Sequence, residues 1–436
     1  MPQQEPSARE KLEQILTRLT VRKADERVFT KLYLETARDE ADAADRRSAQ
    51  GASRGPLDGR IVSIKDLFDV AGEATLAGSI IRQTATPATN DAVVVERLRA
   101  GGAVIIGKTL MTEFAFTAVG LNPHYRVAAN AIDPNRVAGG SSTGAGITVA
   151  EGTSDISIGS DTGGSVRIPA ALNGVVGFKP TAKRVPLEGA FPLSPSLDSI
   201  GPLARSVADC AIADAVMAGE AIAVPEAVSL SGLRIGVPHG QLFAAMEKPI
   251  ADRFEQSLKG CEKAGAVIAE CSIDDLIDAM ADATSAGSIA GIEGSRVHAE
   301  WLHDETLDVD QRVRRPLLAR LSVSQAVYIN LMQRRQALAR QMDQRIADFD
   351  IFALPTIPIA APLIASVVAN EAFYKHTESL LLRNTQVANQ FDLAAISLPL
   401  PGLSLPGGLM LVGRHGADRR LLAMALSVEQ LLSKLV

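Results

Sequence analysis

The sequence predicts an α/β protein in which a central, largely parallel sheet carries helices on both faces. Short β-branched runs alternate with helix-length segments from Arg60 onward, and 47% of the residues are apolar against 22% charged. This alternation is typical of parallel strands joined by helices. Neither an internal repeat nor a linker rich in Pro, Gly and Ser divides the chain. We therefore expect one large α/β domain over residues 55–436, with a helical segment over residues 1–54 packing on it.

The expected elements follow from local patterns. The first helix has one apolar stripe, made of Leu12, Ile15, Leu16 and Leu19. A charged second helix runs through "TKLYLETARDEADAADRRS", and the loop "GASRGPLDG" ends it. A helix through "DAVVVERLRAGG" ends at Gly101 and Gly102, and residues 245–345 are expected to form a helical layer or lid inserted between strands. The expected strands are "RIVSIK", "AVIIGK", "SDISIGS", "GVVGFK", "LRIGVP", "AVIAECS", "DIFALPTIP", "AAISLPL" and "GLMLVG".

Composition excludes several classes of function. The net charge is −6 and Lys and Arg are scattered, so no basic patch for nucleic acid is expected. The polar N-terminus resembles no secretory signal, and no apolar run is long enough to predict a membrane span. The chain has three cysteines, Cys210, Cys261 and Cys271, an odd number that does not suggest a set of disulfides. We therefore expect reduced thiols and a protein that acts in the cytoplasm.

Residues 102–109, "GAVIIGKT", match the phosphate-loop expression GxxxxGK[ST]. In a true phosphate loop the four intervening residues form a turn whose backbone amides face phosphates. Here they are Ala, Val, Ile and Ile, which is typical of a buried strand. We therefore expect no nucleotide at this site, and Lys108 is expected to have a structural role.

Two neighbouring loops are rich in Gly, Ser and Thr: "GGSSTGAG" from Gly139 and "GSDTGGSVRIP" from Gly159. A helix of about ten residues after the first loop rises ~15 Å, and the strand "SDISIG" returns by about 17–20 Å. Ser141 and Ser165, 24 residues apart (165 − 141), should therefore meet at the carboxyl end of a strand. Lys65, which ends the strand "RIVSIK", is expected at the same edge.

Serine needs a base before it can act as a nucleophile, and neither loop contains histidine. A buried Lys65 with a lowered pKa could accept a proton from Ser141, which would accept one from Ser165. Successive backbone amides in "DTGGS", with Gly163 and Gly164 permitting unusual backbone angles, could form an oxyanion hole, so acyl transfer is the expected reaction. The alternative is that both loops are ordinary Gly/Ser turns and that Lys65 only ends a strand.

These segments resemble the amidase signature family. "GGSSTGAG", "GSDTGGSVRIPAALNGVVGFKPT" and "SIKDLFDVAG" are similar to its three main motifs, and "PLSPSLDSIGPLARSVAD" and "FALPTIP" add weaker matches. The resemblance is strong over residues 55–220 and looser over residues 345–430. It implies an α/β/α fold with a mixed central sheet of about eleven strands.

The resemblance also implies a Ser-cisSer-Lys triad without cofactor or metal. Ser165 would be the nucleophile, Lys65 the base and Ser141 the bridging serine, in a cis peptide after Gly140. The backbone amides of Thr162, Gly163, Gly164 and Ser165 would form the oxyanion hole. Ser142 would hydrogen-bond within the triad. Asp161 and Arg167 are expected to form a structural ion pair, although Arg167 could also hold a substrate carboxylate.

The implied function is hydrolysis of a small amide or ureide through a seryl acyl-enzyme, with release of ammonia or an amine. The alternatives are the glutaminase subunit of a tRNA-dependent amidotransferase and a non-catalytic binding protein of the same fold. A homodimer is a family-level expectation. Ser160, Thr143 and Asp392 depart from the family's usual Thr, small residue and Gly, and "LPLPG" and the short helical insertion also differ, so the outer wall of the pocket should differ.

Overall fold

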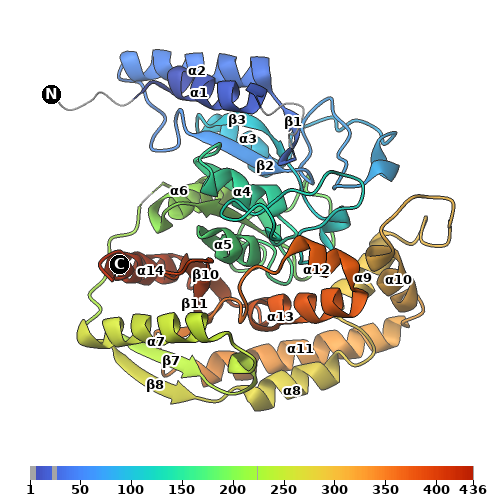
Figure 1. Cartoon of the computed structure of the whole chain (residues 1–436), viewed down its shortest axis with the longest axis vertical. Coiled ribbons are helices and arrows are strands. Elements are labelled where there is room, and N and C mark those ends of the chain that lie inside the picture. Colours follow the sequence, from blue (N-terminus) through green and yellow to red (C-terminus); the bar gives the residue numbers. More distant parts are fainter. Residues whose placement is uncertain (1–5, 22–26, 223, 436) are drawn as a thin grey trace.

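A mixed sheet of eleven strands runs the length of the molecule, in the order β1-β3-β2-β4-β6-β5-β10-β11-β9-β7-β8 (Figure 1). The structure is a computed structural model that describes residues 6–21, 27–222 and 224–435. The strands are β1 Phe29–Leu32, β2 Ile61–Lys65, β3 Val104–Thr109, β4 Ile156–Asp161, β5 Val176–Lys179, β6 Ser199–Ala204, β7 Arg234–Pro238, β8 Val267–Cys271, β9 Ile351–Pro355, β10 Ala394–Pro399 and β11 Gly408–Gly413.

Helices cover both faces of this sheet. They are α1 Ala8–Val21, α2 Leu34–Ala49, α3 Val93–Ala100, α4 Thr143–Ala150, α5 Arg167–Asn173, α6 Val207–Ala218, α7 Lys248–Lys263, α8 Asp274–Ala283, α9 Ile289–Val297, α10 Gln311–Arg320, α11 Gln325–Arg345, α12 Ile364–Ala369, α13 Glu371–Gln390 and α14 Asp418–Leu432. Helices α3, α6, α14 and α7 share one hydrophobic core with the strands, whereas α4, α5 and α13 lie on the side that carries the serine loops. The prediction of an α/β fold with helices on both faces is confirmed.

The expectation of a largely parallel sheet is wrong for the middle of the sheet. Strand β2 is parallel to β3 and β4, and β7 is parallel to β8 and β9, but the strands from β4 through β6, β5, β10 and β11 to β9 pair antiparallel. Most strands are buried on both faces whichever way they run, so their apolar runs carry no information on direction.

The sequence pattern did not predict two of the strands, β1 and β6. Strand β1 occupies Phe29–Leu32, where the second helix was expected to begin, and pairs antiparallel with β3. Strand β6, Ser199–Ala204, contains Gly201 and Pro202, which usually argue against a central strand. The apolar stripe of the first helix is confirmed, since Leu12, Ile15, Leu16 and Leu19 are all buried.

The phosphate-loop match forms strand β3, as expected from its apolar residues. All six residues of β3 are buried, and a Cβ on Gly107 would lie 2.2 Å from the Lys31 carbonyl oxygen. Gly107 therefore permits close approach of β1 rather than a phosphate. The Lys108 ammonium lies 4.0 Å from Asp66 and 3.9 Å from Glu73, inside the protein.

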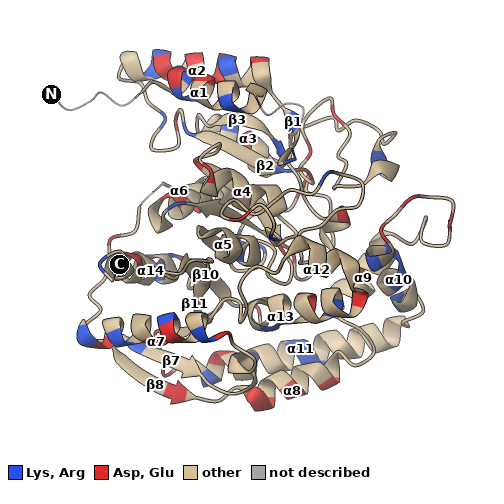
Figure 2. Ribbon diagram, viewed as in Figure 1, with Lys and Arg blue, Asp and Glu red and all other residues tan. Residues whose placement is uncertain are grey.

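Basic and acidic residues are both distributed along the outer helices, for example on α1, α2 and α7 (Figure 2). Within the described ranges, no helix combines the length and apolar character that crossing a membrane requires.

Helices α8 to α11, between β8 and β9, make up most of the expected helical insertion.

Candidate active site

Lys65 ends β2 in the interior of the protein. Strands β2 and β4 are parallel, so Lys65 lies at the same edge of the sheet as the end of β4. Its side chain is fully buried, and Nζ is hydrogen-bonded to Oγ of Ser141 at 2.7 Å and Oγ of Ser160 at 2.8 Å. Burial lowers the pKa of Lys65 to about 7, although the negative charges of Asp198 and Asp161 oppose this shift. A substantial fraction of Lys65 is therefore a neutral amine near pH 7.

The loop before α4 connects Lys65 with the loop that carries Ser165. The Gly140–Ser141 peptide is cis. The backbone N–H of Ser142 donates to the Ser165 carbonyl at 3.2 Å, and its hydroxyl donates to the Ser160 carbonyl at 3.2 Å. The two serine loops thus meet, as the helix and strand lengths predict. In the structure as described, no hydrogen bond joins the hydroxyls of Ser141 and Ser165.

Ser165 follows β4 and lines a cavity of about 180 Å³ together with Thr162 and Gly163. Gly164 has φ +142°, and a Cβ there would lie 2.2 Å from Thr385 Oγ1, so glycine is required. Gly163 has no such left-handed φ, so the expectation of unusual backbone angles at both glycines is wrong for Gly163. The Gly163 carbonyl accepts a hydrogen bond from the Thr385 hydroxyl at 2.7 Å, which fixes the loop against α13.

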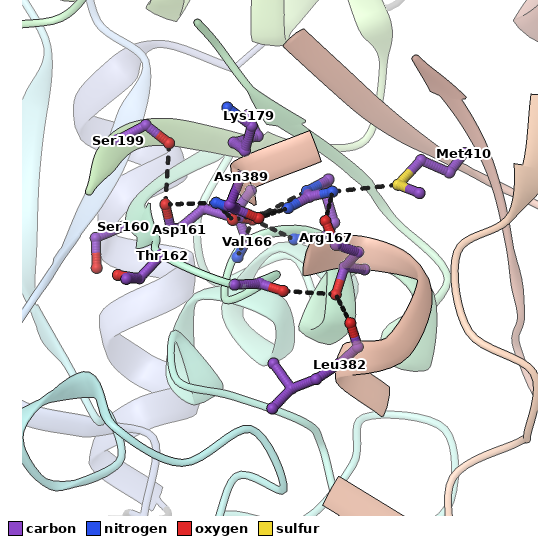
Figure 3. Close-up of polar contacts among 12 residues, drawn as sticks. Ser160, Asp161, Thr162, Val166, Arg167, Lys179, Ser199, Leu382, Asn389 and Met410 are labelled. Atoms are coloured by element: carbon purple, nitrogen blue, oxygen red, sulfur yellow. Dashed lines mark hydrogen bonds and ion pairs between the residues drawn. The ribbon is translucent and has the colours of Figure 1, made fainter. Parts of the chain in front are cut away.

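Asp161 and Arg167 form a buried ion pair beneath this loop (Figure 3). Both side chains are fully buried, with Arg167 Nη2 2.8 Å from Asp161 Oδ1. Asn389 bridges them, because its amide donates to Asp161 and its oxygen accepts from Arg167 (Figure 3). Burial alone would raise the pKa of Asp161, but Arg167 above all, with Lys179 and Asn389, outweighs burial and holds that pKa at about 2.

This arrangement favours the structural role of Arg167 over contact with a substrate carboxylate. Its guanidinium also donates to the Thr385 carbonyl at 2.7 Å, and Arg167 does not line the cavity. Asp161 in addition accepts from the backbone N–H of Val166 at 3.1 Å. The backbone N–H groups of Val166 and Arg167, at the start of α5, are therefore engaged by Asp161.

The cavity beside Ser165 has mostly apolar walls. They come from residues 115–118, from Leu193 and Leu197, from the segment at the start of α9 and from α13. The side chains that line it are Ala115, Phe116, Thr117, Ala118, Thr162, Ser165, Leu193, Leu197, Thr284, Ser288, Ile289, Ala290, Glu378, Leu382, Gln386, Asn389 and Gln390. Among these described lining residues there is no Lys, Arg or His, and Glu378 is the one acidic group. Over the described ranges, no cluster of three His, Cys, Asp or Glu side chains suited to a metal ion is found.

Sequence comparison identifies the family. The chain matches the family described as Amidase over residues 10–422. It belongs to the amidase family. The predicted family is confirmed, and so is the class of enzyme, a hydrolase acting on carbon–nitrogen bonds other than peptide bonds.

Several relatives are similar to this amidase over most of its length. The 2-amino-5-chloromuconic acid deaminase of Comamonas testosteroni is 34% identical, over 91% of this chain and 87% of its own. AtzE, a 1-carboxybiuret hydrolase subunit of Pseudomonas sp. (strain ADP), is 35% identical, over 83% and 80%. A glutamyl-tRNA(Gln) amidotransferase subunit of Chloroflexus aurantiacus is 32% identical, over 98% and 93%. A crystal structure of an amidase superposes with a TM-score of 0.86 at 32% identity, over 98% and 96% of the two chains.

Sequence reasoning assigned no role to Asp198, which braces the loop of this amidase. Its carboxylate accepts from the Thr162 hydroxyl at 2.5 Å and from the backbone N–H groups of Leu193 and Ser194, each at 2.9 Å. Burial raises the pKa of Asp198 to about 6, although these hydrogen bonds oppose the shift. A usable signal was present, since Asp198 lies in "PLSPSLDSIGPLARSVAD", one of the family-like segments.

Two departures from the family pattern have structural consequences in this amidase. Ser160, in place of the usual Thr, supplies the second hydroxyl bonded to Lys65. Asp392 has φ +57°, in the left-handed region that favours glycine, which accounts for the family's usual Gly at that position. One carboxylate oxygen of Asp392 lies 3.3 Å from His415 Nδ1.

Replacing Arg167 with methionine should destabilise the amidase by about 3–5 kcal/mol, because it leaves Asp161 buried and charged without its partner. Urea unfolding followed by circular dichroism measures this loss. The matched control is Lys248→Met, which breaks an exposed ion pair with Asp252 and should change stability by less than about 0.5 kcal/mol. Equal losses in both variants would show that the buried pair has no special role.

Proposed function

We propose that this amidase hydrolyses a small amide or ureide through an acyl-enzyme formed on Ser165. Lys65 would be the base and Ser141 the bridging serine. The observation that carries the proposal is the fully buried lysine, 2.7 Å from Ser141 in a loop whose next backbone N–H bonds to the Ser165 carbonyl. A lysine with a pKa of about 7 can accept a proton near neutral pH without a histidine.

The chemistry would run in two balanced halves. Lys65 takes the Ser141 proton as Ser141 takes that of Ser165, and the Ser165 oxygen attacks the substrate carbonyl carbon. The backbone amides of Thr162, Gly163, Gly164 and Ser165 would stabilise the oxyanion. The proton then passes from Lys65 through Ser141 to the leaving nitrogen, so that ammonia or an amine departs. Water then attacks the acyl carbon as its proton passes through Ser141 to Lys65, and that proton returns to the Ser165 oxygen as the acid leaves.

The alternative function is that of a glutaminase in a two-part amidotransferase, as the amidotransferase relative suggests. Glutamine carries a charged carboxylate, and the described lining of the cavity offers no cation to receive it. The cavity therefore favours the hydrolase that acts alone. A non-catalytic role is disfavoured because Lys65, Ser141 and Ser165 are all present around one site. Cytoplasmic location and a homodimer stay predictions.

Ammonia release from a panel of amides and ureides by the purified chain alone tests the proposal. We expect turnover of small, uncharged amides with no added partner. If glutamine is the one substrate turned over, and a co-purifying partner protein is required, the result would support the amidotransferase function instead. Absence of turnover together with tight ligand binding would support the binding protein.

A further inference from the structure

Glu378, on α13, stands where the reaction cavity meets a second, larger cavity. The outer cavity has a volume of about 600 Å³. Phe116 and Glu378 line both cavities. The cationic residues of this region, such as Arg312 and Lys375, line the outer cavity and not the inner one. Among the described lining residues, Glu378 is therefore the one acidic residue that borders both cavities.

The Glu378 carboxyl retains capacity to bind a ligand. Its Oε1 accepts one hydrogen bond, from the Ala118 backbone N–H at 2.9 Å. A carboxylate can accept about four hydrogen bonds, and no described residue donates another to Glu378. The charge of Arg312 opposes the effect of burial on Glu378, but the guanidinium pairs with Glu371 at 3.2 Å and lies over the Tyr374 ring. Burial raises the pKa of Glu378 to about 7, so a partner that donates hydrogen bonds would stabilise its charged form.

The dimensions and the walls of the inner cavity limit the rest of the substrate. The inner cavity has a volume of about 180 Å³. This is below the ~300–1,000 Å³ of common drug-sized sites, so only a short group fits between Ser165 and Glu378. Leu193, Ile289 and Leu382 contribute apolar surface to it. A substrate carboxylate would lose its hydration here without gaining a cation, and would also meet Glu378.

We propose that Glu378 determines the specificity of this site, and that the substrate is a short amide with an apolar body and a second, hydrogen-bond-donating nitrogen that Glu378 binds. The inference rests on the proposed function, because it assumes that the scissile carbonyl lies at Ser165. It separates this chain from the two relatives named for carboxyl-bearing compounds, 2-amino-5-chloromuconic acid and 1-carboxybiuret.

Three straight-chain primary amides of equal length, ending in an amino, a methyl or a carboxylate group, test the proposal. We expect kcat/KM for the amino-ended amide to exceed that of the methyl-ended one by about tenfold or more, as a hydrogen bond to a charged group implies. The carboxylate-ended amide should be the poorest substrate. Glu378→Gln should raise KM for the amino-ended amide about tenfold and leave kcat, and both constants of the methyl-ended amide, within about threefold.

The control is Glu371→Gln, which removes the same charge from the same helix but outside the inner cavity. It should keep the wild-type order of substrates. A preference for the carboxylate-ended amide, or an equal effect of Glu378→Gln on all three amides, would overturn the inference.

Calorimetric binding of the three amides to Ser165→Ala separates this inference from the proposed function. Preferential binding of the amino-ended amide that Glu378→Gln abolishes supports the role of Glu378 even if no amide is turned over. Turnover of the methyl-ended amide that depends on Ser165, without any preference for an amino group in turnover or binding, refutes the inference and leaves the proposed function intact.

Discussion

Replacing Ser165 with alanine should lower kcat for any amide substrate by at least about 10³-fold, because the variant lacks the oxygen that forms the acyl-enzyme. Loss of the nucleophile removes a covalent step that the oxyanion hole and substrate binding cannot replace. The fold should be unaffected, since Ser165 lines the cavity and the loop is held by Thr385, Asp198 and Asp161. Initial rates of ammonia release, with thermal unfolding of each protein, measure both quantities.

A trapped intermediate makes the test of Ser165 more specific. Mass spectrometry of rapidly quenched wild-type enzyme should show the mass of one acyl group, located on the peptide that contains Ser165. Ser433→Ala is a suitable control, because this exposed serine lies at the end of α14, far along the chain from the site. Acylation of Ser165→Ala at the wild-type rate would exclude Ser165 as the nucleophile.

The strands that sequence reasoning found and those that it missed differ in their local composition. Strands with short apolar runs, such as Val104 to Ile106 in β3 and Leu409 to Val412 in β11, are buried on both faces, and the pattern finds them. Strand β6 is also buried throughout, but it contains Gly201 and Pro202. Pro202 lies opposite Ile158 of β4, but β5 pairs with β6 at Leu203 and Ala204 only, so Pro202 has a strand partner on one side alone. A partner strand, rather than the local sequence, determines that β6 exists.

Strand β1 had a usable signal in a different part of the chain. Gly107 interrupts an otherwise apolar strand, and such a glycine indicates that another backbone comes close. The sequence does not show which backbone this is. The direction of strands in the centre of the sheet is likewise set by how the connections cross the molecule, which the apolar pattern does not record.

The candidate site likewise contains residues that the sequence could predict and residues that it could not. Lys65, Ser141 and Ser165 could be predicted because each lies in a compact motif, and the lengths of α4 and β4 bring two of them together. Glu378 lies 213 residues after Ser165 (378 − 165), in a helix whose pattern indicates only which face is buried. The position of Glu378 beside the cavity depends on the packing of α13 against the serine loop, which is a tertiary property. Asp198 is an intermediate case, since its segment was recognised but its hydrogen bonds were not predictable.

Replacing Lys65 with methionine should lower kcat/KM by about 10²–10⁴-fold, the usual contribution of a general base. In the wild type, kcat/KM should rise with pH and level off above an apparent pKa of about 7, because Lys65 must lose its proton before it can accept one from Ser141. At the ordinary lysine pKa of ~10.4, only about one molecule in 2,500 would have a neutral amine at pH 7. Burial of Lys65 would thus make the proposed relay usable near neutrality.

Stability separates a catalytic Lys65 from a structural one. The pKa of Lys65 is lower in the folded protein than in the unfolded chain, so the unfolded chain binds more protons between about pH 7 and the ordinary lysine pKa. The lysine therefore lowers wild-type stability as pH falls through that range, and the cost is fully present below pH 7. Lys65→Met should remove this dependence and be at least as stable as wild type at pH 7, while losing activity. If the variant instead unfolds readily at pH 7 and activity per folded molecule persists, Lys65 serves the fold and another group must accept the proton.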